Sequence, residues 1–324
     1  PAGWATGSAR LSDFVFPEGA AKGRPFCWEI GQPLGASVKS SSLASPMLFC
    51  YNQIRTGERG VGDLVLAIDI GNSTTDIGLF DREGTLRFRS ALATSRNASG
   101  DQCAMNLMGV FSLYQADIRA VSGAILSSVV PSVTANMCAA VERLSGKSPM
   151  LIGPGIKTGL NIKADFHNQL GSDIVACCVA AVAAYPSPLI VIDMGTAVTM
   201  SYLRNNSYEG CVIMPGVRVA LEALSERAAA LPHISIEPPA HIFGHNTVDA
   251  MRSGVVYGNA SMVDGMIQRL EEQSAPVSAV VATGRSAPEV LKYCKREILY
   301  DTDLLLRGLH LIYRKNTEGK GRRA

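Results

Sequence analysis

Two short segments of the chain each place an aspartate and a glycine at the end of an apolar run. Residues 65–74 read VLAIDIGNST, and residues 189–198 read LIVIDMGTAV. A glycine lets backbone N–H groups approach a phosphate, and Asn, Ser and Thr side chains add hydrogen-bond donors. A carboxylate at the same place can hold a cation or a water molecule of its hydration shell. The two segments therefore predict a site that handles a nucleoside triphosphate.

Each of these segments is expected to be the first arm of a β-hairpin. An apolar run of this length that ends at a glycine is typical of a buried strand. More β-favouring sequence follows each run, at residues 76–80 and 198–203. The aspartate and the glycine then lie at the tip of each hairpin. Two such tips in one chain indicate a duplicated domain in which both tips face one cleft.

The pattern of strands and helices also repeats along the chain. Strands come first in each half, and helices and strands then alternate, which is typical of an α/β fold with mixed sheets. The duplication predicts two actin-like (ribonuclease-H-like) domains, each a mixed sheet flanked by helices, with a central cleft between them. We place the first domain at residues 63–187 and the second at 188–316. Residues 1–62 are expected to be a poorly ordered extension, and residues 317–324 a flexible tail.

The elements that we expect in the first half are a hairpin (64–80), strands (85–94, 120–130 and 150–152) and helices (101–114, 133–144 and 171–184). In the second half we expect a hairpin (189–203), strands (around 211–213, 278–282 and 297–300) and helices (216–230, 247–272, 287–295 and 303–314).

Composition excludes several classes of protein. The chain has 324 residues, enough for about two domains, and a net charge of +2. No basic stripe with interleaved aromatics is present, so we expect no nucleic-acid partner. No apolar stretch is long enough to span a bilayer, and no signal peptide is evident at the start. The eight cysteines form no Cys-x-x-Cys pair, which favours reduced thiols in a cytoplasmic protein.

Two other patterns are weaker than they look. His241 and His245 are four residues apart, the spacing of two metal ligands on one face of a helix. The nearby Pro239 and Gly244 make a helix unlikely here, so we interpret this segment as a loop without a metal site. Residues 153–159 read GPGIKTG and superficially resemble a phosphate-binding loop. The order is wrong, because that motif needs Gly-Lys-Ser/Thr at the start of a helix.

From residue 64 to residue 313 the chain resembles the type III pantothenate kinases. The segment Asp69–Ser73 is similar to the family's Asp-x-Gly-Asn-Thr motif, with Ser in place of Thr. Residues 193–197, reading DMGTA, are similar to its second phosphate motif. Further matches are SSVVP (127–131), GPGIKTGL (153–160), GSD (171–173), PG (215–216), RAA with LP (227–232) and residues 246–254. Each match is weak alone, but their order and spacing make the resemblance specific.

The resemblance implies ATP-dependent phosphorylation of pantothenate, the first step of coenzyme A synthesis. It implies ATP with Mg²⁺, a monovalent cation (K⁺ or NH₄⁺) and a homodimer. Asp173 would accept the proton of the substrate hydroxyl, and Asp193 would bind the monovalent cation. The residues implied for ATP are Asp69, Ile70, Gly71, Asn72, Ser73, Thr74, Thr75, Asp76 and Thr196. Those implied for pantothenate are Gly171, Ser172, Asp173, Ile174 and Thr247.

Four of these residues also have a purely structural alternative. Asp173 and Thr247 each begin a predicted helix, where capping is a common role. Asp69 and Asp193 could bond to local N–H groups as turn residues.

The chain departs from the family pattern at three positions. Ile174 takes the place of an Arg expected to pair with the pantothenate carboxylate, and Ala164 takes the place of a substrate-contacting Tyr. Arg285 replaces the last Gly of a Thr-Gly-Gly motif, near the expected adenosine region. Two alternatives to an active pantothenate kinase therefore stay open. One is a nucleotide-binding regulatory homologue without turnover, and the other is a kinase for a different small hydroxyl acceptor.

Overall fold

The first half of the described chain is built on a five-stranded mixed sheet. The computed structural model describes residues 63–162 and 170–318. The predicted extension (1–62), Ala164 and the tail from residue 319 lie outside these ranges. The strand order is β3-β2-β1-β4-β5, with β1 antiparallel to β2 and parallel to β4. The strands are β1 (Leu64–Ile70), β2 (Thr74–Phe80), β3 (Leu86–Ala93), β4 (Val121–Ser128) and β5 (Met150–Leu151).

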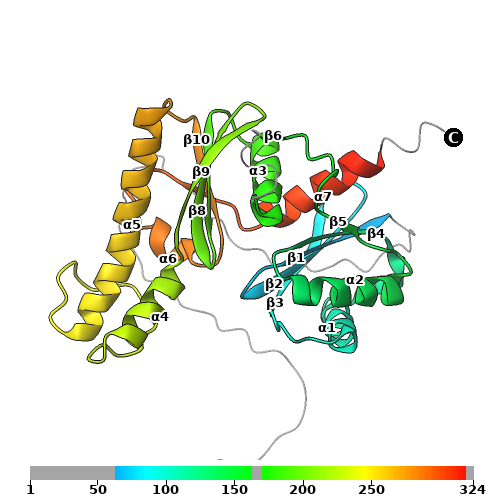
Figure 1. Cartoon of the computed structure of the whole chain (residues 1–324), viewed down its shortest axis with the longest axis horizontal. Coiled ribbons are helices and arrows are strands. Elements are labelled where there is room, and N and C mark those ends of the chain that lie inside the picture. The colour runs from blue at the N-terminus through cyan, green and yellow to red at the C-terminus, as the bar shows by residue number, and fades with distance from the viewer. Residues whose placement is uncertain (1–62, 163–169, 319–324) are drawn as a thin grey trace, which may run out of the picture. The chain divides into compact units, whose positions relative to one another are not determined.

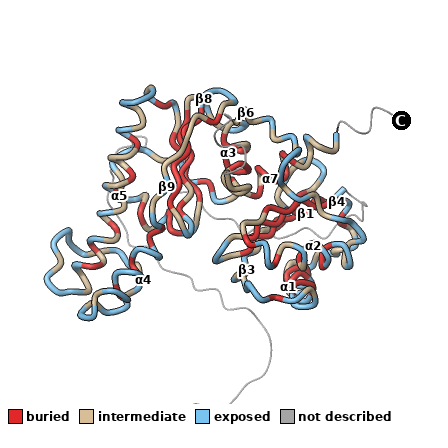
Figure 2. Tube along the Cα trace, viewed as in Figure 1, coloured by how far each residue is buried: buried red, intermediate tan, exposed pale blue. Residues whose placement is uncertain are grey.

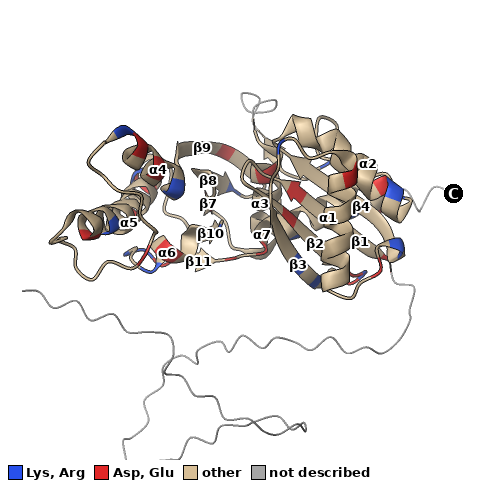
Figure 3. Ribbon diagram, turned by 90° about the horizontal axis from the view of Figure 1, so that it is seen from below, with Lys and Arg blue, Asp and Glu red and all other residues tan. Residues whose placement is uncertain are grey.

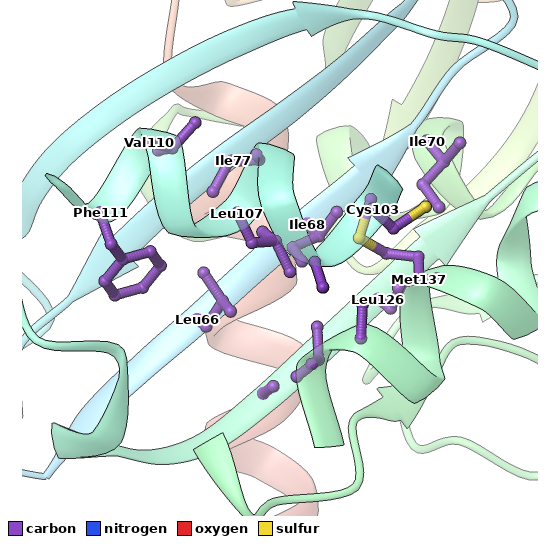
Figure 4. Packing of buried hydrophobic residues seen from close by; sticks show 14 of the residues in the cluster. Leu66, Ile68, Ile70, Ile77, Cys103, Leu107, Val110, Phe111, Leu126 and Met137 are labelled. Carbon is purple, nitrogen blue, oxygen red and sulfur yellow. The ribbon is translucent and has the colours of Figure 1, made fainter. Parts of the chain in front are cut away.

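Two helices cover one face of this first sheet. They are α1 (Gly100–Leu113), capped by the Ser99 side chain, and α2 (Pro131–Ser145), which ends at the left-handed Gly146. A short 3₁₀ helix (Ile118–Ala120) leads into β4. Figure 4 shows Leu107 of α1 and Met137 of α2 among the apolar side chains of the strands. Leu66, Ile68 and Ile70 of β1 are buried on this face, while Val65 and Ala67 are buried on the other, which explains why β1 reads as a continuous apolar run.

The second half is built on a six-stranded mixed sheet. Its strand order is β11-β10-β7-β8-β9-β6. Strands β6, β8, β9 and β10 are labelled in Figure 1. The strands are β6 (Asn161–Ile162), β7 (Leu189–Met194), β8 (Ala197–Arg204), β9 (Ser207–Pro215), β10 (Ala279–Thr283) and β11 (Leu299–Tyr300). The short β6 was not predicted, and it comes from the first half of the chain to pair with β9. Figure 2 shows that the central strands of both sheets are buried.

A long helix covers one face of the second sheet. It is α5 (Thr247–Gln273), whose Val263 and Ile267 pack in one cluster with Ile190 and Ile192 of β7. It is one continuous helix, and its bounds agree with the predicted helix at 247–272 to within one residue. The shorter helices of this half are α4 (Val217–Arg227) and α6 (Ala287–Leu291).

The remaining two helices each cover the sheet of the opposite half. Helix α3 (Ser172–Ala184) packs Cys177 and Ala181 into the cluster of the second sheet, with Val191. Helix α7 (Leu304–Thr317) packs Leu309 and Ile312 into the cluster of the first sheet. The two helices also pack on each other, which places the N-terminus of α3 between the sheets.

The close approach of α3 and α7 depends on a small residue. A Cβ atom at Gly308 of α7 would meet the backbone oxygen of Ala176 in α3. Helix α7 continues to Thr317, three residues past the predicted end. Its Asn316 donates a hydrogen bond to the Lys157 carbonyl (2.9 Å), which ties the end of the helix to the 153–159 loop, and Thr317, the first residue of the predicted tail, is helical. The rest of the tail stays a prediction.

No helix within residues 63–162 and 170–318 is long and apolar enough to cross a membrane.

Candidate active site

The tips of the β1–β2 and β7–β8 hairpins meet. Each tip is a tight turn: the Gly71 N–H donates to the Thr74 carbonyl (2.9 Å), and the Gly195 N–H donates to the Ala197 carbonyl (3.0 Å). The hydroxyls of Ser73 and Thr196 are 3.1 Å apart and hydrogen-bonded. This contact brings together two phosphate-type motifs that are 123 residues apart in the sequence.

Asp69, at the end of β1, is almost completely buried, with 5% of its surface exposed. One carboxylate oxygen, Oδ1, is buried without a hydrogen-bond partner. Burial, followed by the charges of Asp173, Asp76 and Asp193, raises the pKa of Asp69 to about 8, against the opposing effect of a Ser127 hydrogen bond. An unpartnered buried carboxylate oxygen is costly, and a bound cation would remove that cost.

Asp193 is the equivalent residue at the end of β7. Burial, followed by the charges of Asp173 and Asp76, raises the pKa of this carboxyl to about 7, although its side chain keeps some exposure. Asp173 and Asp193 also act on Asp69, so the three carboxylates form one electrostatic group. The prediction that these three acids share one region of the fold is consistent with this arrangement. Figure 3 shows acidic segments beside α3.

Asp173 lies in the first turn of α3, which puts it between the two sheets. Its Oδ1 accepts a hydrogen bond from the Ile174 N–H (2.8 Å), and a Cβ atom at Gly171 would meet that same oxygen. Glycine at 171 therefore leaves room for the carboxylate. The N-cap of α3 is Gly171, which has no side chain, so Asp173 is not the cap.

A chain of hydroxyls joins α3 to the first tip. The hydroxyls of Ser172 and Ser127 are 2.8 Å apart, and Ser127 is fully buried. A hydrogen bond from Ser127 also lowers the pKa of Asp69, so Ser127 connects Ser172 to this carboxyl. This chain holds the start of α3 at a fixed place beside Asp69. The sequence did not single out Ser127 for this role, although it lies in the matched SSVVP segment.

Asp76 is held by two arginines that the sequence-based site does not contain. It lies opposite Asp69 in the β1–β2 pairing. Arg89 of β3 reaches its Oδ1 at 3.2 Å, and Arg285, in the loop after β10, reaches the same oxygen at 3.5 Å. Arg285 was noted in the sequence as a side chain near the adenosine region, but in the structure it extends to the first tip.

The other predicted nucleotide residues surround the first tip in different ways. The Ile70 side chain is buried in the core of the first sheet, so only its backbone faces the tip. The Asn72 side chain accepts a hydrogen bond from Arg96 (3.2 Å), and Thr75 is bonded to Thr94 (3.0 Å). Thr74 is half-buried at the start of β2.

The predicted acceptor residues are less closely grouped. Ile174 is half-buried and packs on the apolar cluster of the second sheet. Thr247 is the first residue of α5 and is exposed. The cap of α5 is Asn246, whose side chain accepts from the Asp249 N–H (2.9 Å), so capping does not account for Thr247. Within residues 63–162 and 170–318, Thr247 makes no hydrogen bond to any of the three carboxylates.

The carboxylates fit a divalent cation that is shared with a ligand. In the described part of the chain, no three His, Cys, Asp or Glu side chains are grouped closely enough to hold an ion by themselves. Mg²⁺ usually takes one or two carboxylates and completes its shell with water and substrate phosphates. The unpartnered Asp69 oxygen supplies one such ligand.

Comparisons with known proteins agree with this geometry. The model of the type III pantothenate kinase family matches residues 65–269. The chain is 39% identical to a type III pantothenate kinase of Halalkalibacterium halodurans, over 78% of this chain and 100% of that protein. It is also 39% identical to one of Brevibacillus brevis, over 78% of this chain and 99% of that protein.

A solved structure supports the fold alone. The activator of the 2-hydroxyisocaproyl-CoA dehydratase from Clostridium difficile, with bound ADPNP, matches with a TM-score of 0.50 at 10% identity, over 81% of this chain and 98% of that chain. The predicted duplicated actin-like α/β fold is thus confirmed. Because the family model covers well over half of the chain and the relatives are covered almost completely, the chain belongs to the type III pantothenate kinase family.

Proposed function

We propose that the protein transfers a phosphoryl group from ATP to pantothenate, giving 4'-phosphopantothenate in the first step of coenzyme A synthesis. The observation that carries this proposal is the meeting of two phosphate-type hairpin tips beside the Asp173 carboxylate, in a chain of this family. The family match supports the substrate, and the geometry supports the type of reaction.

The first tip is proposed to bind the phosphates of ATP. The Asp69–Asp76 segment offers backbone N–H groups of a glycine turn and the Ser73 hydroxyl, and Thr196 adds a second hydroxyl from the other tip. Asp69 would hold Mg²⁺, which would supply positive charge to offset that of the phosphates. Asp69 then keeps its charge, because a cation favours the ionised form of a neighbouring carboxyl.

Asp173 is proposed to orient the acceptor. A carboxylate at the start of α3 can accept the hydrogen bond of the substrate hydroxyl and receive its proton as the phosphoryl group is transferred. Phosphoryl transfer has a loose transition state, so positioning of the nucleophile matters more than the strength of the base. The Ser172–Ser127–Asp69 chain fixes the distance between the base and the phosphate tip.

Asp193 is proposed to bind the monovalent cation. Its charge has no ion-pair partner within the described residues, and its pKa is raised by burial and by neighbouring carboxylates. A bound K⁺ or NH₄⁺ would stabilise the ionised form of this group.

A homodimer is proposed from the family and from the surface of the second half. Large apolar side chains are exposed on β9, on α4 and in the connection to α5, and a contact with a second copy of the chain would cover them. They are Ile213, Val219, Leu224, Ile242 and Phe243. Cytoplasmic location stays a prediction.

A kinase for a different small hydroxyl compound is the second candidate function, favoured by Ile174. This residue packs in an apolar cluster at the position where the family resemblance implies an arginine for an acid group. Charge-assisted hydrogen bonds contribute about 1.5–3 kcal/mol, so an acceptor that lacks a carboxylate would lose less at this position.

An assay that couples ADP release to a colour change, with and without pantothenate, tests these proposals. Pantothenate-stimulated turnover supports the proposed function. Turnover with another hydroxyl acceptor only supports the second candidate. Binding of ATP without turnover on any acceptor would point to a regulatory homologue.

A further inference from the structure

The Arg285 side chain extends from the second hairpin to the first, close to the place where their tips meet. It follows Thr283, which lies beside Asp193 in the β10–β7 pairing, so its backbone belongs to the second tip. Its guanidinium nevertheless reaches Asp76 of the first hairpin, 209 residues away in the sequence. The proposed phosphate site lies between these two tips.

The backbone below Arg285 is held firmly. Gly284 has a φ of +95°, and a Cβ atom there would lie 2.6 Å from the backbone N of Met194. The Ser286 N–H donates to the Met194 carbonyl (3.2 Å), and the Tyr300 hydroxyl donates to the Gly284 carbonyl (3.4 Å). The loop therefore fixes the starting point of the arginine, while 49% of its side chain stays exposed and can change direction.

The ion pair between Arg285 and Asp76 is replaceable. It is 3.5 Å long, whereas Arg89 holds the same Asp76 oxygen at 3.2 Å. Arg89 is itself anchored by the Thr302 carbonyl and by Asp303 at 3.4 Å. If Arg285 turns away, Asp76 keeps a cationic partner and stays compensated.

We propose that Arg285 is a polyphosphate-binding residue that leaves Asp76 for the terminal phosphate oxygens of ATP. The inference rests on the proposed nucleotide site and names a further residue of it. A guanidinium matches the geometry of phosphate oxygens and can bind two of them at once. It also supplies positive charge from the second half of the fold to a site where burial and three neighbouring carboxylates raise the pKa of Asp69, and where Arg89 comes from the first half.

Titration of the full chain with ATP, ADP and AMP by calorimetry, with Mg²⁺ and without any acceptor, tests this proposal. Arg285→Ala is expected to weaken ATP binding by about 10-fold or more, the effect of losing a charge-assisted hydrogen bond, while AMP affinity is unchanged. Arg285→Lys keeps the charge without the planar fork, so its ATP affinity should fall between those of the wild type and the alanine variant.

Arg143→Ala is the matched control. Arg143 is also exposed and pairs across two elements, with Asp101 at 2.8 Å, but it lies on α2. Its removal should leave ATP affinity unchanged.

Unchanged ATP affinity in Arg285→Ala would overturn the proposal. An equal loss of affinity for ATP and for AMP would also overturn it, because the side chain would then contact the adenosine. If the alanine variant unfolds, equal ATP affinity of Arg285→Lys and wild type would also overturn it. Because no acceptor is present, absence of pantothenate turnover does not affect this result. A wild-type chain that binds no ATP would refute both this inference and the proposed function.

Discussion

The two hairpin tips share a frame but differ in how their charge is balanced. In the first hairpin the residue opposite Asp69 is Asp76, and two arginines contact Asp76. In the second hairpin the residue opposite Asp193 is Thr199, and Asp193 has no ion pair within residues 63–162 and 170–318. The two hairpins therefore have the same backbone arrangement but differ in the charged residues at their tips. One tip carries two carboxylates with arginines beside them, and the other carries one carboxylate without compensation.

This difference supports the division of roles that we propose. A tip with paired acids and nearby arginines suits a phosphate chain with its divalent cation. A single uncompensated carboxylate suits a monovalent cation, which needs less negative charge around it. Asp173 belongs to neither tip, because α3 carries it between them.

The largest effect is expected from Asp173→Asn. This substitution tests whether the proton acceptor is a residue outside the two tips that bind ATP. Turnover should fall by about 10²–10⁴-fold, the usual contribution of a positioned base, with ATP affinity nearly unchanged. Steady-state kinetics and ATP titration measure the two quantities. Asp101→Asn is the matched control, because Asp101 is also the second residue of a helix. Wild-type turnover in Asp173→Asn would remove this residue from the mechanism.

The next effect separates the two tips by their cations. Asp193→Asn should abolish stimulation of turnover by K⁺, with a loss of about 10-fold or more at saturating K⁺, as expected for a lost charged contact. Asp69→Asn should instead weaken the response to Mg²⁺ and leave the response to K⁺. Cation titrations at fixed ATP compare the variants. If both substitutions change the response to the same cation, the tips do not differ in the way proposed.

A backbone substitution tests how tightly the second tip is packed. Gly284→Ala should lower the free energy of unfolding by about 3 kcal/mol, from crowding against Met194 and from an unfavourable positive φ. Denaturant unfolding measures the change. Gly258→Ala in α5 is the control, because nothing lies within 4 Å of its Cβ position, and alanine is the better helix former there. A small loss in Gly284→Ala would mean that the loop can shift.

The smallest effect is a difference in the pH dependence of stability. A carboxyl whose folded pKa is raised stabilises the folded protein below its unfolded pKa, and this contribution is lost as the pH rises through the folded value. Relative to Asp193→Asn, wild type without ligands should therefore lose on the order of 2 kcal/mol between pH 5 and pH 8. Unfolding of both proteins across this range measures the difference.

The same experiment distinguishes the tips. Wild type should also lose stability relative to Asp69→Asn as the pH rises, because burial raises the pKa of both carboxyls. Curves that are parallel for both variants would show that the two acids have equivalent surroundings.

The sequence was sufficient for the parts of the site that depend on local pattern. Apolar runs that end in Asp-x-Gly predicted both hairpins, and the boundaries of most helices and strands are within a few residues of those observed. The predictions failed where distant segments meet. Neither the pairing of β6 with β9 nor the reach of Arg285 to Asp76 leaves a local signal, because both depend on contacts between the two halves. Ser127 was missed for the same reason: its partner, Ser172, is 45 residues away.

The placement of α7 on the first sheet has a consequence for protein synthesis. The ribosome makes β1 and β4 long before residues 304–317. One apolar face of the nascent sheet therefore stays exposed until α7 has been made. The first half therefore cannot finish folding while it emerges, and exposed strands of this kind are typical targets of chaperones. A chain truncated before Leu304 would lack Leu309 and Ile312 in the cluster of the first sheet and Leu304 in the cluster of the second, so both apolar cores would be incomplete.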